Sequence, residues 1–178
     1  GVGGDLTKSD QCKKVVDLAL NSWGRLDILD NNIGIASKLS VVDELEEDWD
    51  KIMKVNLKPM FLMSKYAIPA MINTGEGGSI VNISSISATR PKGLTSYSAS
   101  KGAVLSLSQA MAVDHGADGI RVNCILPGPV YTPMVYTSGM TDKHRSQRQN
   151  ASLIQVEGDG WDIGLSLIHI SEPTRPLY

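Results

Sequence analysis

The chain has 178 residues, of which 42% are hydrophobic and 20% charged, a balance typical of a globular domain and not of a disordered chain. Its formal net charge of −2 argues against a nucleic-acid-binding surface. Two cysteines give neither a disulfide framework nor metal-ligand spacing, and no apolar run approaches the ~20 residues of a membrane span. We therefore expect a soluble cytoplasmic protein with no metal, no nucleic acid and no membrane contact.

A helix followed by a short strand is predicted at the start of the chain. Thr7 and Asp10 have the spacing of a capping box, and apolar residues at helical spacing lead to Gly24, which fits a helix C-terminus. A short apolar strand over 26–31 follows, and Asn31-Asn32-Ile33-Gly34 forms the turn that ends it. This alternation indicates an α/β fold with a parallel sheet.

A longer helix is predicted from Asp43 toward Ile72, with two interruptions. Proline inside a helix costs ~3 kcal/mol, because it clashes with the carbonyl four residues earlier and has no N–H to bond it. Pro59 therefore predicts a bend at Val55-Asn56, which would free main-chain groups beside the polar Asn56 side chain. Pro69 predicts a second disturbance near Lys65.

Residues 79–101 carry the most specific chemical pattern. A buried strand over 79–83 ends in two hydroxyls, Ser84 and Ser85, and a small-residue helix then opens with Tyr97 and Lys101. The last two residues are four apart and share one helix face. A nearby ammonium favours an ionised phenol, which can exchange a proton with an alcohol or alkoxide oxygen, and a serine hydroxyl can hold that oxygen.

The remainder of the chain predicts one more strand and a polar region. A strand is expected over 120–126, stopped by Pro127-Gly128, with residues 130–132 leaving along its end. Residues 134–155 are polar and fit either a mobile flap over a site or a solvated surface helix.

The order of these motifs resembles the short-chain dehydrogenase/reductase family. Asn31-Asn32-Ile33-Gly34 is similar to its N-N-A-G turn, Asn56 to its helix-kinking asparagine, and Tyr97 with Lys101 to its Y-x-x-x-K motif. Ser85 is similar to its catalytic serine and Pro127-Gly128 to its P-G motif. The resemblance implies an α/β, three-layer α/β/α partial Rossmann fold over 1–164 that binds NAD or NADP.

The resemblance also implies roles for individual residues. Tyr97 would be the general acid/base, Ser85 would position the substrate oxygen, Lys101 would assist Tyr97 and bind the nicotinamide ribose, and Asn56 would hold a water on its carbonyl. The implied cofactor-binding set is Asp5, Leu6, Asn32, Ile33, Gly34, Tyr97, Lys101, Pro127, Gly128, Val130 and Thr132. Because the interval from Ser85 to Tyr97 is one residue shorter than is common in the family, Ser84 stays an alternative to Ser85.

Both ends of the chain depart from the family pattern. The glycine-rich G-x-x-x-G-x-G turn, which would hold the pyrophosphate, is absent, so we expect a partial chain. Residues 165–175 match the translation of a transposon-type sequencing adapter, and we expect 165–178 to be an artefact without a domain.

The expected function is an NAD(P)-dependent oxidoreductase that acts on a small alcohol or ketone, such as a 3-oxoacyl thioester or a sugar. Two alternatives remain: a non-redox lyase-like, epimerase-like or regulatory relative on the same fold, and a truncated fragment that is inactive. The family resemblance also implies a homodimer or homotetramer.

Overall fold

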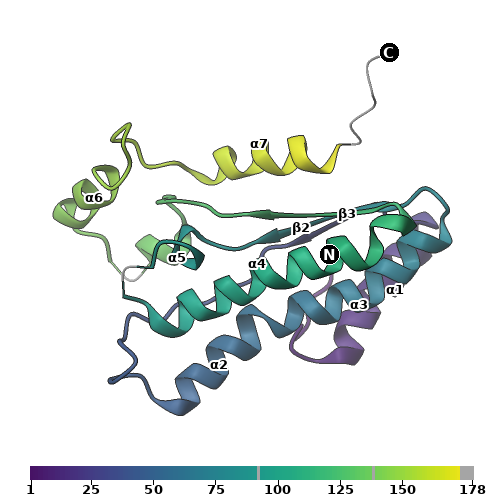
Figure 1. Cartoon of the computed structure of the whole chain (residues 1–178), viewed down its shortest axis with the longest axis horizontal. Coiled ribbons are helices and arrows are strands. Elements are labelled where there is room, and N and C mark those ends of the chain that lie inside the picture. The colour runs from purple at the N-terminus through teal and green to yellow at the C-terminus, as the bar shows by residue number, and fades with distance from the viewer. Residues whose placement is uncertain (92, 138, 173–178) are drawn as a thin grey trace. The chain divides into compact units, whose positions relative to one another are not determined.

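The computed structural model describes residues 1–91, 93–137 and 139–172 (Figure 1). The chain separates into two compact units, Gly1–Leu126 and Pro127–Tyr178. The first unit contains, in order, α1 (Ser9–Trp23), β1 (Ile28–Asn31), α2 (Glu46–Asn56), α3 (Lys58–Asn73), β2 (Gly78–Ile83), the 3-10 helix η1 (Ile86–Ala88), α4 (Thr95–His115), η2 (Gly116–Asp118) and β3 (Ile120–Ile125).

The sheet of the first unit is parallel, with the strand order β1-β2-β3. Leu29 of β1 lies opposite Ile80 of β2, and both join a buried apolar cluster with residues of α1, α3 and α4. Figure 1 accordingly shows these helices along one face of the sheet. Parallel strands need crossover connections, which α2, α3 and α4 provide. The predicted α/β class with a parallel sheet is confirmed.

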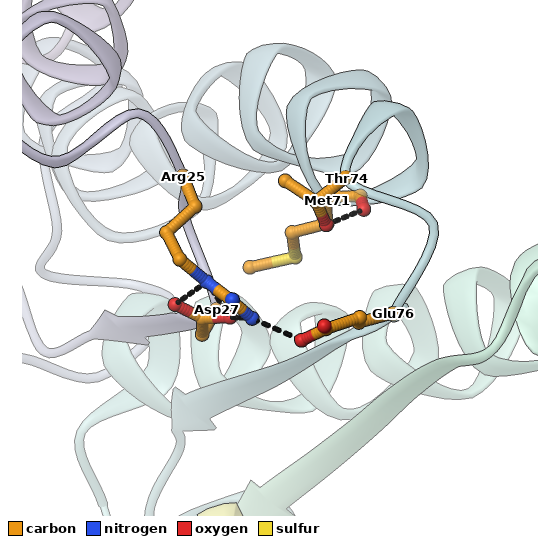
Figure 2. A network of polar contacts seen from close by, with 5 residues as sticks. All are labelled: Arg25, Asp27, Met71, Thr74 and Glu76. Atoms are coloured by element: carbon orange, nitrogen blue, oxygen red, sulfur yellow. Dashed lines mark hydrogen bonds and ion pairs between the residues drawn. The ribbon is translucent and has the colours of Figure 1, made fainter.

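The amino ends of the strands are joined by a polar network (Figure 2). Arg25 donates to Asp27 from Nε at 2.9 Å and also pairs with Glu76 in the turn between α3 and β2. In the same turn the Thr74 hydroxyl donates to the carbonyl of Met71 at 2.7 Å. The ion pairs are exposed and therefore contribute little to stability. They lie at the end of the sheet opposite to the carboxyl ends of the strands.

The first helix begins later than its capping pattern predicts. α1 starts at Ser9 with Lys8 at the N-cap and no side-chain cap, so the proposed capping box of Thr7 and Asp10 is wrong. Instead, the Thr7 N–H donates to Asp5 Oδ1 at 2.9 Å, which forms a turn before the helix. The C-terminus is as predicted, since Gly24 adopts φ 72° and its N–H donates to the carbonyl of Leu20.

The predicted bend at Asn56 is confirmed as a break between two helices. α2 ends at Asn56 and α3 begins at Lys58. Pro59 then lies in the first turn of α3. Backbone N–H groups there have no acceptor within the helix, so the missing N–H of proline costs no helical hydrogen bond. The first helix of the pair begins at Glu46 and not at Asp43.

The predicted second disturbance near Lys65 is wrong. α3 runs without interruption over Lys58–Asn73 and includes Pro69. Lys65 and Pro69 are both exposed. Water can therefore bond the Lys65 carbonyl, and the pyrrolidine ring lies on the solvent side of the helix, so the cost of the proline is reduced.

The second unit is mainly helical. It contains α5 (Pro133–Tyr136), α6 (Asp142–Gln149) and α7 (Gly160–Ser171). Val130 pairs with Gly158 in an isolated parallel bridge. α7 spans the predicted boundary at residue 164, and 173–178 of the expected artefact lie outside the described residues. That boundary stays a prediction. Across 1–91, 93–137 and 139–172, no helix has the length and apolarity that crossing a membrane requires.

Candidate active site

Lys101 is a buried amine at the carboxyl end of the sheet. It belongs to α4, is only 4% exposed, and its Nζ donates to the carbonyl of Ile83, the last residue of β2, at 2.7 Å. Burial disfavours the charged ammonium and lowers the pKa of Lys101 to about 8. Burial therefore makes the neutral amine easier to form than it is for a lysine in water.

Asn56 connects the turn after β1 to α4. Its Oδ1 accepts from the N–H of Ile35 at 2.8 Å, while Nδ2 donates to the Ile35 carbonyl and to Ser100 Oγ, each at 2.9 Å. The side chain is fully buried and three of its hydrogen-bonding positions are used. The asparagine thus acts as a clamp between two segments that are distant in sequence.

Gly34 brings the same turn against Lys101. A Cβ at this position would lie 3.2 Å from Lys101 Nζ and 3.5 Å from Asn56 Oδ1. A side chain here would crowd the amine. The glycine of the predicted Asn31–Gly34 turn therefore avoids a tight contact with Lys101, and it places the turn beside Asn56 and Lys101.

The two serines after β2 have different roles. Ser84 Oγ donates to the main-chain carbonyl of Lys101 at 2.7 Å in a buried contact, so its hydroxyl is already used in the fold. Ser85 caps η1, where its Oγ accepts from the Ser87 N–H at 3.2 Å. Among the described residues, no acceptor takes the Ser85 hydroxyl hydrogen. This distribution favours Ser85 over Ser84 as the substrate-facing serine.

Tyr97 lies in the first turn of α4, one turn before Lys101. Its ring is half-buried, and Lys101 Nζ lies 5.9 Å from the ring centroid. Its hydroxyl has no hydrogen-bond partner within the described part of the chain. η1, capped by Ser85, packs against α4. The Tyr97 phenol and the Lys101 amine are thus presented from α4, and the Ser85 hydroxyl from the N-cap of η1.

The other predicted residues of the first unit lie in the segments before α1 and after β1. The Asp5 carboxylate is exposed, and hydrogen bonding from Thr7 lowers the pKa of its carboxyl. The carbonyl of Leu6 accepts from Cys12 Sγ at 3.1 Å. Asn32 is exposed and Ile33 half-buried. The contacts of these residues with a coenzyme stay a prediction.

Pro127, Gly128, Val130 and Thr132 belong to the second unit. Thr132 is the N-cap of α5, and its carbonyl accepts from the Val135 N–H at 2.8 Å. Their assignment to the coenzyme site also stays a prediction.

The sequence reasoning missed a set of buried polar residues behind the site. Asn31 Nδ2 donates to Asn82 Oδ1, and Asn82 Nδ2 donates to Ser108 Oγ, both at 2.8 Å. Ser100 Oγ donates to the Tyr97 carbonyl at 2.8 Å. These residues could have been found in the sequence as polar residues inside an otherwise apolar strand or helix face. A buried polar side chain is stable only with a hydrogen-bond partner, so each one predicts another nearby.

Comparisons with known proteins agree with this geometry. The family model described as "short chain dehydrogenase" matches residues 1–143. The chain is 39% identical over 142 residues to the 3-oxoacyl-[acyl-carrier-protein] reductase FabG of Thermotoga maritima, covering 79% of this chain and 56% of that one. It is 35% identical over 139 residues to the glucose and ribitol dehydrogenase of Daucus carota, covering 77% and 47%. The chain thus spans about half the length of these curated relatives.

Solved structures give the same result. A putative short-chain dehydrogenase/reductase from Burkholderia xenovorans superposes with a TM-score of 0.85 at 34% identity, covering 94% of this chain and 65% of that one. Ligand-free aldohexose dehydrogenase of Thermoplasma acidophilum superposes with a TM-score of 0.89 at 29% identity, covering 96% and 70%. The protein belongs to the short-chain dehydrogenase family.

Proposed function

We propose that the protein is an NAD(P)-dependent oxidoreductase that interconverts a secondary alcohol and a carbonyl compound. The observation that carries the proposal is the placement of the buried Lys101 amine. The amine lies against Gly34, donates to the carbonyl of Ile83 and is one helical turn from Tyr97, whose hydroxyl has no hydrogen-bond partner among the described residues. Buried amines beside an unpartnered phenol are suited to proton transfer.

The reacting side chains divide the work between proton transfer and positioning. Tyr97 gives its phenolic proton to the substrate oxygen during reduction and takes it back during oxidation. The Ser85 hydroxyl, whose Oγ accepts from the Ser87 N–H and whose hydrogen has no acceptor within the described part of the chain, would donate to the same oxygen. Lys101 holds its amine 5.9 Å from the centroid of the Tyr97 ring. These three groups supply the acid–base half of the reaction.

The residues present fit a nicotinamide coenzyme. Lys101 Nζ uses one of its three donors on Ile83, and its other donors suit ribose hydroxyls. The absence of a side chain at Gly34 avoids a tight contact with the Lys101 amine. When bound, the coenzyme supplies or accepts the hydride. The residues proposed to hold it are Asp5, Leu6, Asn32, Ile33, Gly34, Tyr97, Lys101, Pro127, Gly128, Val130 and Thr132.

Asn56 is proposed to hold a water through its carbonyl. Its side chain is committed to Ile35 and Ser100, which leaves the main chain for this role. Asn56 is the last residue of α2, and carbonyls in the last turn of a helix lack helical partners. A water there would connect Lys101 to solvent and replace the proton that Tyr97 gives away.

The substrate class is proposed from the relatives. Their names include a 3-oxoacyl-[acyl-carrier-protein] reductase, a glucose and ribitol dehydrogenase, and an NADPH-dependent aldehyde reductase. We propose a small alcohol or ketone as substrate, a cytoplasmic location, and a homodimer or homotetramer. Apolar side chains on α3 and α4, Phe61 and Val113, are 49% and 83% exposed and offer surface for contact between copies.

The test is coenzyme oxidation or reduction by the protein expressed from its complete reading frame. Absorbance at 340 nm is followed with NADH and NADPH against ketones and aldehydes, and with NAD and NADP against alcohols and sugars. We expect turnover in the wild type and its loss in Tyr97→Phe. Tyr66→Phe, in which the tyrosine lies on α3 and bonds Ser9, is the matched control. Coenzyme binding without turnover on any substrate would contradict the proposal.

A further inference from the structure

Glu44, in the connection between β1 and α2, binds the first turn of α4. Its Oε1 accepts from Ser96 Oγ at 2.5 Å and its Oε2 from the Ser96 N–H at 3.2 Å. Ser96 is fully buried, and Glu44 is half-buried. Hydrogen bonds to an ionised carboxylate are roughly twice as strong as neutral ones. This contact joins two segments that are 52 positions apart.

The first turn of α4 needs such a partner. The first four N–H groups of a helix have no acceptor within it, and Leu94 at the N-cap offers no side-chain acceptor. Leu94 also has φ 62°, a conformation that a leucine rarely adopts. Glu44 accepts from the Ser96 N–H, and the carbonyl of Leu39 accepts from the Thr95 N–H at 3.3 Å. The β1–α2 connection therefore caps α4 at two consecutive amides.

Tyr97 immediately follows Ser96, and the Tyr97 main chain is also held at its carbonyl. The Tyr97 carbonyl accepts from Ser100 Oγ, which in turn accepts from Asn56 Nδ2. We propose that Glu44 is a positioning residue that anchors the first turn of α4 and so keeps the Tyr97 phenol aligned for proton transfer. The inference rests on the proposed function of Tyr97.

The experiment compares three variants of the protein expressed from its complete reading frame. Glu44→Ala removes both acceptors, Glu44→Gln keeps one amide oxygen, and Glu47→Ala changes an exposed glutamate of α2. A small misplacement of a reacting group costs up to about a hundredfold in rate. We expect kcat to fall about tenfold or more in Glu44→Ala with the coenzyme KM within about twofold, to recover in part in Glu44→Gln, and to stay unchanged in Glu47→Ala.

Amide hydrogen exchange over 94–101 is measured on the same proteins as a readout that does not need turnover. If the wild type turns over and a folded Glu44→Ala keeps its kcat, the inference is wrong although the proposed function stands. If the wild type has no activity, the proposed function fails. Exchange at Ser96 and Tyr97 that is no faster in Glu44→Ala than in Glu47→Ala would then overturn the anchoring role as well. Should Glu44→Ala not fold, the same comparison is made with Glu44→Gln.

Discussion

Lys101 is held at both its amine and its main chain by consecutive residues at the end of β2. Its Nζ donates to the carbonyl of Ile83 at 2.7 Å, and its own carbonyl accepts from Ser84 Oγ at 2.7 Å. A long, flexible side chain is thereby fixed at the carboxyl end of the sheet. This fixation supplies the preorganisation that electrostatic assistance to Tyr97 would require.

The buried Lys101 predicts a specific dependence of stability on pH. Its pKa is lowered to about 8 in the folded protein and is near 10.5 when unfolded. Between these values the unfolded state binds the extra proton, so this group makes the protein more stable as pH rises. The free energy of unfolding of wild type relative to Lys101→Met should rise between pH 8 and 10.5, by at most about 1.4 kcal/mol per pH unit. Denaturant unfolding at several pH values measures it, and a flat difference would contradict the burial of a titrating amine.

Removing the Asn56 clamp should destabilise the protein. Asn56→Ala leaves the Ile35 N–H and carbonyl without their partner, and each unsatisfied buried group costs about 1–3 kcal/mol. We expect a loss of about 2 kcal/mol or more in the free energy of unfolding. Asn73→Ala, at the exposed end of α3, is the matched control and should change little. Equal effects of the two substitutions would show that the clamp contributes nothing.

The sequence was sufficient for features that depend on local chemistry. The break at Asn56 followed from the geometry of Pro59, and the C-terminus of α1 followed from Gly24. Features that depend on tertiary contacts were missed. Exposure decides that Pro69 is tolerated, and only the fold brings Glu44 to Ser96. Local patterns carry no information on which distant residue supplies a partner.

The close approach of Gly34 to Lys101 predicts that a substitution at Gly34 lowers activity more than it lowers stability. In Gly34→Ala the new methyl group would lie 3.2 Å from Lys101 Nζ, so the amine must shift by a few tenths of an ångström. We expect kcat/KM to fall about tenfold, because the displaced group is the amine proposed to assist the reaction. Gly116→Ala, where a Cβ meets nothing within 4 Å, is the control for adding a methyl group. Unchanged kcat/KM in a folded Gly34→Ala would show that the contact with Lys101 is not functional.

Substitution of the two serines after β2 should have different effects, on stability at Ser84 and on catalysis at Ser85. Ser84→Ala removes a buried hydrogen bond to the Lys101 carbonyl and should lower the free energy of unfolding by about 1–3 kcal/mol. Ser85 caps only the short helix η1, so Ser85→Ala should cost less stability. It should reduce kcat by about a hundredfold, because it removes the proposed donor to the substrate oxygen. Thermal unfolding and steady-state kinetics on both variants provide the test. The reverse pattern, with kcat lost in Ser84→Ala at unchanged stability, would make Ser84 the reacting serine, in agreement with the short interval to Tyr97.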